Sequence, residues 1–462
     1  MSEGERVERA ITLAGELLDA ARAGTTRSER RRQERLGRLI GDPAGRELVL
    51  RLTDEVLRLR RPAAAADRFA ALVATGVPSS LGAVDRLMLR TGARAARLAP
   101  GVVMPLVRRR ILAETRGLIV PAEDRPLTRH LRRRAADGTR QNLNLLGEAI
   151  LSDAEADQRV DRVVALLRRP DVDYVSVKIS ALCALLDVYA FEHSVDRICV
   201  ALRRVYDAAL ESSPPAFVNL DMEEYADLHL TVEAFLRVRA EAPYRAMPAG
   251  IVLQAYLPDS HAALERIGDW AAARVAAGGA PVKVRIVKGA NLAMETVDAD
   301  LHGWVAAPYA TKAGSDASYK RMLDSALRPE WAGAVRVGVA SHNLFELAWA
   351  LCLRDDLPAE RRGDVEFEML EGMVPAQARA VHARAGNLLL YCPIVRADEI
   401  EASLAYLARR LDENTSPDNF LRAMFTMTPG SPEFRAEGER FRAAVAARHT
   451  VAIEPRRPGW AV

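Results

Sequence analysis

Eight short apolar segments, separated by segments with helical periodicity, constrain the fold of this chain more than any other feature. In the fifth segment, valines and an isoleucine alternate with Lys283 and Arg285, which is the period-two pattern of a β-strand. Strands that alternate with helices pair in parallel through right-handed crossovers. Eight such units predict an α/β protein with a closed (β/α)8 barrel of the TIM type. The segments span residues 142–148, 174–180, 217–223, 250–256, 282–291, 335–342, 365–370 and 387–392.

An open, doubly wound sheet is the main alternative for the same alternation of strands and helices. The dinucleotide-binding form of that fold carries a G-x-G-x-x-G motif after its first strand, and this chain has none there. Before the barrel, apolar residues recur at helical spacing. We therefore predict a helical N-terminal region (1–135), a barrel (136–425) and a C-terminal helical tail or linker (426–462) with a helix over 431–447.

Composition excludes several classes of protein. The chain has 462 residues, 49% hydrophobic and 27% charged, with a formal net charge of +3, so nucleic-acid binding is not expected. The four cysteines show no CxxC pair and no metal-ligand spacing, so we predict no metal site and a reducing compartment. No secretory signal and no membrane-spanning run is recognised, and we expect a cytoplasmic protein.

The predicted strands end in a polar, strongly cationic set of residues. The active site of a (β/α)8 barrel lies at the carboxyl ends of its strands, so we expect these side chains to share one face. Each alone has a structural explanation, but their coincidence at equivalent positions favours a functional site. The set is Glu148, Lys178, Asp221, Gln254, Arg285, Lys288, Ser341, His342, Leu370 and Tyr391.

Two further features bear on the ligand. A helix predicted over 400–413 carries the adjacent Arg409 and Arg410, which together with Lys178 would suit a small carboxylate, because bidentate pairing gives orientation as well as energy. Lysine occurs at only five positions, and Lys178 and Lys288 both follow predicted strands. A Schiff-base aldolase built on either lysine is therefore a competing interpretation.

Seven motifs occur in an order and spacing that resemble one known family. They are VSVKIS (175–180), NLDME (219–223), LQAY (253–256), RIVKGA (285–290), ASHN (340–343), EFEMLEGM (366–373) and RRLDEN (409–414). The family is the FAD-dependent proline dehydrogenases, and the likeness is greatest to the proline dehydrogenase domain of bifunctional proline utilisation A proteins. The resemblance covers roughly residues 142–414 and implies a distorted (β/α)8 barrel that holds FAD.

The resemblance also implies a role for each matching residue. The catalytic residues would be Asp221, Arg285 and Lys178. The proline carboxylate would be bound by Lys178, Arg409 and Arg410, with Leu370 and Tyr391 against the pyrrolidine ring. Residues that would bind or support FAD are Gln254, Arg285, Val287, Lys288, Gly289, Ala290, Lys312, Ser341, His342, Asn343 and Glu413, the last by holding the arginine helix.

The implied reaction is the oxidation of L-proline to Δ1-pyrroline-5-carboxylate by hydride transfer to FAD, the first step of proline degradation to glutamate. Arg285 would stabilise negative charge on the reduced flavin. We expect Asp221 to orient and to contribute electrostatically rather than to act as a strong base. The family passes its electrons to a membrane quinone, so a peripheral contact with the inner face of the membrane is implied. The basic N-terminal helices, including 27–38, are one candidate for it, although a charge run is more often a solvated face.

Three positions depart from the family pattern. Asn291 stands where many members have tyrosine, Ser341 replaces threonine, and Glu371 replaces histidine and is expected to face away from the substrate. Because of Asn291, a catalytically silent flavin-binding regulatory module is another interpretation. The segment after Asn414 has no room for an aldehyde dehydrogenase, so a pyrroline-5-carboxylate dehydrogenase would be a fused domain of a longer chain or a separate partner.

Overall fold

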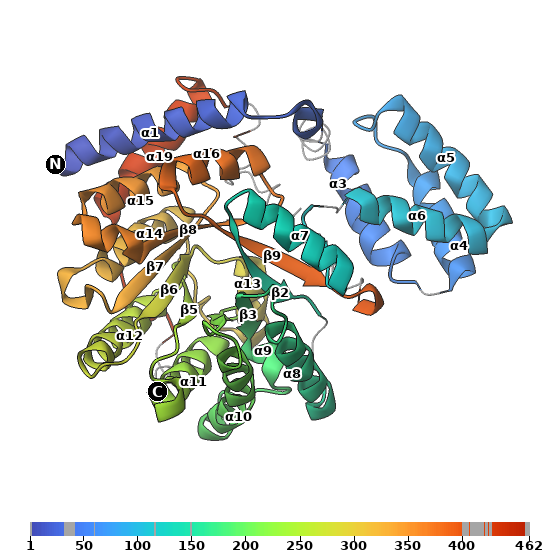
Figure 1. Ribbon diagram of the computed structural model, residues 1–462. Helices are drawn as coiled ribbons and strands as arrows, with labels where there is room; N and C mark the ends of the chain where they lie inside the picture. The colour runs from blue at the N-terminus through green and yellow to red at the C-terminus, as the bar shows by residue number, and fades with distance from the viewer. Residues whose placement is uncertain are drawn as a thin grey trace.

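The computed structural model shows the predicted barrel (Figure 1). It describes residues 2–31, 42–59, 61–114, 117–147, 150–399, 406, 420, 424 and 427–457. Every strand pair is parallel, and β9 pairs with both β8 and β2, which closes the sheet. The eight barrel strands are β2 Arg140–Leu145, β3 Tyr174–Lys178, β4 Phe217–Asp221, β5 Ala249–Gln254, β6 Val282–Val287, β7 Val335–Ala340, β8 Val365–Leu370 and β9 Leu389–Val395. The prediction of a closed barrel is confirmed, and the open sheet is excluded.

One strand was not predicted. The two-residue β1 (Val120–Pro121) pairs in parallel with the end of β9, where Val120 lies opposite Ile394. It leads into α7 (Asp124–Ala136), which lies beside β1 and β2. This short pairing attaches the chain that enters the barrel to the rim of its last strand.

Helices connect the successive strands, and most of them lie around the outside of the barrel (Figure 1). The connecting helices are α8 Asp153–Leu167, α9 Ile179–Leu182, α10 Phe191–Leu210, α11 Asp227–Ala240, α12 Asp259–Ala276, α13 Leu292–His302, α14 Lys312–Ala326, α15 Leu344–Asp356 and α16 Pro375–Ala385. Side-chain caps start several of them: the Ser152 hydroxyl accepts from the Glu155 amide at 3.3 Å, and the Thr311 hydroxyl accepts from the Gly314 amide at 3.1 Å. Such caps satisfy amides that a helix leaves without an internal partner.

The first and last of the described helices pack on the same side of the barrel (Figure 1). Helix α1 (Glu3–Ala23) begins with a capping box between Ser2 and Glu5 and packs on α15 and α16. Helix α19 (Pro432–Ala447) packs on α14 and α15 and is capped by Ser431, as the sequence predicts for 431–447. Arg448, directly after α19, ties this helix to α1 and α14, because it donates to Glu3 at 2.7 Å and to Asp324 at 2.7 Å.

A separate group of helices follows α1, and we call it the helical subdomain. It consists of α3 Pro43–Arg51, the π-helical turn Leu52–Val56, α4 Pro62–Thr75, α5 Ala83–Leu98 and α6 Pro100–Glu114. Its helices surround a core of their own, distinct from the barrel core. In Figure 1 it stands to one side of the barrel, with α5 on the side away from it.

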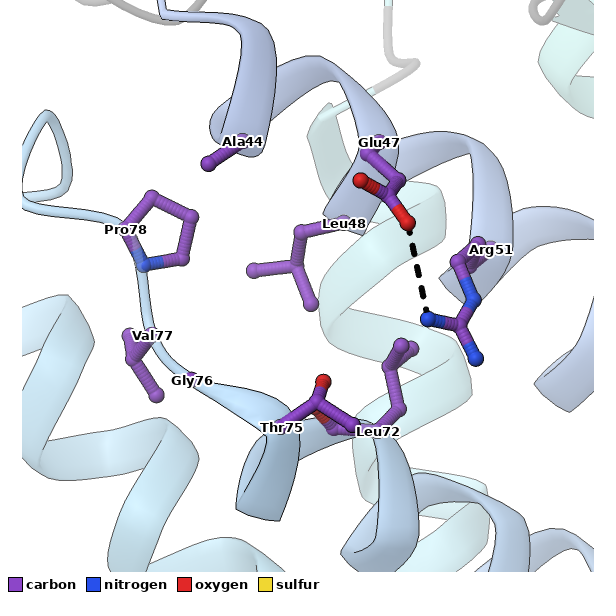
Figure 2. A pocket seen from close by; sticks show the side chains of 9 residues that line it. All are labelled: Ala44, Glu47, Leu48, Arg51, Leu72, Thr75, Gly76, Val77 and Pro78. Atoms are coloured by element: carbon purple, nitrogen blue, oxygen red, sulfur yellow. Dashed lines mark hydrogen bonds and ion pairs between the residues drawn. The ribbon is translucent and has the colours of Figure 1, made fainter.

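A cavity of about 340 Å³ opens in this subdomain, far from the barrel strands (Figure 2). Apolar side chains such as Leu48, Leu72 and Val77 form most of its wall, and an ion pair between Glu47 and Arg51 lies at its edge at 3.6 Å. The other polar side chain of its wall, Thr75, donates its hydroxyl to the Leu72 carbonyl at 2.7 Å. Among the described residues, no helix is long and apolar enough to cross a membrane.

Candidate active site

Arg285 lies at the centre of a buried charge network inside the barrel. Its Nε donates to Glu368 Oε2 at 2.6 Å, and its Nη1 donates to Asp221 Oδ1 at 2.8 Å. All three side chains are buried. Burial alone would lower the pKa of Arg285, but Glu368 and Asp221 raise it more, so the guanidinium stays charged. Its Nη2 is buried and has no hydrogen-bond partner in the described part of the chain.

The network continues toward the other end of the barrel through Lys283. This lysine forms ion pairs with Glu368, at 2.5 Å, and with Glu366. Burial opposes its charge, but the two carboxylates raise its pKa above the ordinary value. Positive and negative groups therefore alternate from Glu366 through Lys283 and Glu368 to Arg285 and Asp221.

A glycine between the two strands makes this network possible. Strand β7 lies between β6 and β8 in the sheet, and Gly338 sits in it opposite Arg285 and Glu366. A β-carbon at Gly338 would collide with the Glu368 carboxylate and come within 2.8 Å of the Lys283 side chain. The missing side chain leaves the room in which charges from β6 and β8 meet.

Asp221 is held on both carboxylate oxygens. Its Oδ1 accepts from Arg285 and, at 3.1 Å, from the side-chain Nδ2 of Asn219. Its Oδ2 accepts from the Tyr391 hydroxyl at 2.8 Å. Burial and the neighbouring carboxylate raise the pKa of Tyr391 well above its usual range, so the phenol keeps its proton and donates it. The Arg285 guanidinium also lies over the Tyr391 ring, 5.3 Å from its centroid. These contacts fix Asp221 in place.

Lys178 lies at the end of β3, directly opposite Asp221 in the strand register. Its Nζ donates to Glu223 Oε1 at 2.7 Å, and its side chain is partly exposed. Gln254, at the end of β5, donates to the Glu223 carbonyl at 3.3 Å, and its own Oε1 is buried without a partner among the described residues. Lys178 and Gln254 therefore meet at Glu223, as the strand-end prediction requires.

A second ionic cluster surrounds Lys288, just beyond β6. Its ammonium donates to Asp316 at 2.5 Å and to Glu346 at 3.0 Å. Lys312 reaches the other oxygen of Asp316 at 2.5 Å, and the buried Lys320 donates to Glu346 at 2.8 Å. Burial alone would lower the pKa of Lys288, but both carboxylates raise it. An amine held protonated in this way is a poor nucleophile, which argues against Lys288 as a Schiff-base lysine.

The end of β7 carries three of the predicted cofactor residues. The Ser341 hydroxyl accepts from the Asn343 amide at 3.0 Å, and the Asn343 side chain caps α15 by accepting from Phe345 at 2.9 Å. His342 Nε2 accepts from the Leu370 amide at 3.0 Å, which assigns that nitrogen as unprotonated. This contact links the ends of β7 and β8, so His342 and Leu370 are brought together.

Gly289 shapes the turn that leaves β6. Its φ is +119°, a region that side chains disfavour, and a β-carbon there would overlap the Tyr256 ring. Val287 ends the strand and Ala290 follows the turn, after which Asn291 precedes α13. The motif from 285 to 290 thus needs glycine for a structural reason.

Some predicted residues lie outside the described part of the chain. Glu148, Arg409, Arg410 and Glu413 are among them, as is nearly all of the helix predicted over 400–413. Glu371, by contrast, is described: it is buried and accepts from Arg134 Nε of α7 at 3.1 Å. It pairs with the outer helix α7, consistent with the expectation that it faces away from the substrate.

Sequence reasoning missed the carboxylates that hold the cations. Glu368, Asp316 and Glu346 each pair with a residue that had been assigned a role, yet none of them was assigned one. A signal for Glu368 was present, because β6 and β8 each carry two charged residues of the same parity, Lys283 with Arg285 and Glu366 with Glu368. Asp316 and Glu346 lie on helices, where no such register indicates a partner.

A closed parallel barrel with charged side chains gathered at the carboxyl ends of its strands defines the class of (β/α)8 barrel enzymes. The particular family follows from comparison with known proteins. Residues 127–423 match the model of the proline dehydrogenase family, and the chain belongs to this family of enzymes.

Individual relatives agree with this assignment. A proline dehydrogenase from Deinococcus radiodurans is 29% identical over 283 residues, which cover 60% of this chain and 78% of that protein. The structure of proline utilization A from Corynebacterium freiburgense is 42% identical, with a TM-score of 0.68, over 83% of this chain and 37% of that one. Proline utilization A from Bdellovibrio bacteriovorus, inactivated by N-propargylglycine, shares the fold at 24% identity, with a TM-score of 0.77 over 98% of this chain and 46% of that one. This chain spans less than half the length of these two structures.

Proposed function

We propose that this protein oxidises L-proline to Δ1-pyrroline-5-carboxylate with FAD as the electron acceptor, as the first step of proline degradation to glutamate. The observation that carries the proposal is Arg285, a charged guanidinium fixed by Glu368 and Asp221 with a buried N–H left over. A cation held in advance where negative charge develops lowers a barrier without reorganising.

The donor set fits FAD. Arg285 Nη2 and Gln254 Oε1 are buried polar atoms without hydrogen-bond partners among the described residues. A large polar cofactor at the barrel mouth would supply the missing partners. Lys288 and Lys312 hold two ammonium groups near the end of β6, suited to anionic or hydroxyl groups of the cofactor. When bound, FAD would supply the hydride-accepting chemistry that no amino-acid side chain provides. The remaining proposed cofactor residues are Val287, Gly289, Ala290, Ser341, His342, Asn343 and Glu413.

The protein's own residues would bind and orient proline. Lys178 would pair with the substrate carboxylate, with Arg409 and Arg410 as further partners that lie outside the described residues. Tyr391 and Leu370 would pack on the ring. Asp221, with both oxygens engaged, would position Arg285 and Tyr391 rather than remove a proton.

The flavin spectrum tests the cofactor and the reaction together. Purified protein is expected to be yellow, and to bleach when L-proline is added without oxygen or any other acceptor. A colourless protein that does not take up FAD, or a yellow one that proline does not reduce, would refute the proposal. The second result would instead support a catalytically silent flavin-binding module.

A substrate pair tests the role of Lys178. Replacing it as Lys178→Met should lower kcat/KM for L-proline by about 10- to 100-fold, the usual worth of a hydrogen bond to a charged group. Pyrrolidine, which lacks the carboxylate, is the matched control and should be affected little. An equal loss for both compounds would place Lys178 elsewhere in the mechanism.

The electron acceptor would be a membrane quinone, reached by a cytoplasmic protein through a peripheral contact with the membrane. A pyrroline-5-carboxylate dehydrogenase, as a fused domain or a separate partner, would consume the product. The fusion is supported by the likeness to two proline utilization A structures, each more than twice the length covered here.

A further inference from the structure

Helix α5 of the helical subdomain has two apolar faces. Its inner face packs into the core of the subdomain through Leu89, Ala93 and Ala96. A second set points to solvent: Val84, Leu87, Met88 and Leu98 are all exposed, and Leu98 is 88% exposed. A helix that merely covers a small core needs one apolar face, with polar residues opposite. The second face is therefore unexplained by folding.

The exposed apolar residues of α5 share one face of the helix. At about 100° per residue, positions 84, 87, 88 and 98 fall within about 100° of one another, with Thr91 and the partly exposed Ala95 on the same face between them. On the next helix, α6, Val102 and Leu106 are also exposed. We call the set on α5 the α5 strip: Val84, Leu87, Met88 and Leu98.

The charge around the α5 strip is mostly positive, and Asp85 is the one acidic residue of α5. From Arg86 to Ala113 the chain contains no acidic residue and seven arginines: Arg86, Arg90, Arg94, Arg97, Arg108, Arg109 and Arg110. Arg90, Arg94 and Arg97 lie along one flank of the strip, are exposed, and form no ion pair with any carboxylate of the described residues. An exposed apolar stripe bordered by arginine is the pattern of a helix that lies in the interface of an anionic bilayer.

We propose that the α5 strip docks this protein onto the surface of a membrane that contains anionic phospholipids. The aliphatic side chains would enter the boundary between head groups and acyl chains, and the flanking arginines would pair with lipid phosphates. A protein partner would need acidic groups around an apolar groove, whereas an anionic bilayer provides both features everywhere. The biological purpose of this docking rests on the proposed function, the transfer of electrons to a membrane quinone. The binding experiment below does not depend on that function.

The position of the strip agrees with this role. In Figure 1, α5 lies on the side of the helical subdomain away from the barrel, so lipid can approach it without meeting the barrel helices. The subdomain has its own core, and its helices pack mainly on one another. It can therefore present the strip while the barrel keeps its geometry.

Cosedimentation with vesicles tests the proposal on the purified, FAD-loaded protein. Wild type is expected to bind vesicles of equal parts phosphatidylglycerol and phosphatidylcholine, and to bind phosphatidylcholine alone much more weakly. The double variant Leu87→Ser/Leu98→Ser should lose at least about tenfold in apparent affinity, because two exposed leucines would no longer enter the apolar layer. Val200→Ser on α10, where Val200 is 60% exposed, is the matched control and should bind like wild type.

Charge and oligomeric state complete the test. Arg90→Gln/Arg94→Gln should weaken binding to the anionic vesicles severalfold while leaving the weak binding to phosphatidylcholine unchanged. Failure of wild type to bind, or binding that the strip variant leaves unchanged, would overturn the proposal. The proposal would also be overturned if the strip instead joined two copies of the chain. The Leu87→Ser/Leu98→Ser variant would then sediment as a smaller species than wild type.

Proline oxidation is measured in parallel with a soluble dye as acceptor. Unchanged dye reduction in the strip variants shows that the barrel is intact. Loss of proline-dependent flavin bleaching in wild type would refute the proposed function, while vesicle binding would still be observed if the docking surface is real. The two failures are thus distinguishable.

Discussion

Glu368→Gln should be among the most destabilising conservative changes in this protein. The carboxylate is buried and pairs with Arg285 at 2.6 Å and with Lys283 at 2.5 Å. Removing one partner of a buried ion pair typically costs 3–5 kcal/mol, because a charge is left uncompensated. Arg285 keeps Asp221 and Lys283 keeps Glu366, so we expect the lower end, about 3 kcal/mol.

The assay is urea unfolding followed by tryptophan fluorescence on FAD-loaded protein. The matched control is Glu211→Gln, which breaks a two-contact pair with Arg168 of similar length on the surface, at 2.7 and 2.8 Å. Surface pairs contribute little, so this variant should unfold nearly as wild type does. Similar losses in the two variants would refute the argument that burial makes the network important.

The pH dependence gives a second check on the same carboxylate. Burial alone would raise the pKa of Glu368, but Arg285 and Lys283 lower it more, so its folded-state pKa lies below its unfolded value. Its contribution is then fully present above the unfolded pKa of about 4.3 and is lost as the pH falls through the folded value. The difference between wild type and Glu368→Gln should therefore shrink in acid; a difference that stays constant would mean that charge is not its cause.

Three other changes test the turn at Gly289, the hydroxyl of Tyr391 and the carboxyl of Asp227 at the start of α11. Gly289→Ala brings a β-carbon against Tyr256 at a φ of +119° and should therefore lower the FAD content of purified protein, measured as flavin absorbance per chain. Full retention of FAD would contradict the proposed role of this turn in cofactor binding. Tyr391→Phe should raise KM for L-proline and lower the unfolding free energy by about 1–3 kcal/mol, because it removes the donor to Asp221; unchanged values for both would refute its role. Burial and nearby Glu224 raise the pKa of Asp227 to about 7, so its ionisation opposes folding between about pH 4 and 7, and Asp227→Asn should become more stabilising over that range, by up to about 4 kcal/mol, then level off above it. A stability difference that does not change with pH would show that Asp227 titrates normally.

The fold could be predicted from the sequence because the spacing of apolar residues along the chain by itself distinguishes strands from helices. All eight strand segments correspond to strands of the barrel, and the helix over 431–447 was placed within one residue. The strand β1 was missed because two residues carry no period. Its pairing depends on β9, which lies far along the chain, so no local pattern could reveal it.

The sequence predicted which residues lie at the candidate site but not how their side chains pair. Strand ends identify which residues share the mouth of a barrel, and this rule brought Lys178, Asp221 and Tyr391 to one region. It does not say which side chains pair with which. The role of Gly338 illustrates the limit: a glycine inside a strand was unremarkable until the charges of β6 and β8 were seen to meet over it.

The scarcity of lysine has a practical consequence for work on this protein. Of its five lysines, Lys283 and Lys320 are buried, Lys178 and Lys288 are half-buried at the barrel mouth, and Lys312 is exposed beside them. Among the lysine side chains, reagents that acylate amines under native conditions can therefore reach those at the mouth of the barrel, where Lys288, held protonated by Asp316 and Glu346, should react more slowly. Immobilisation or dye labelling through lysine should block the site, and protection of these amines by a bound molecule would give a direct chemical footprint of its occupancy.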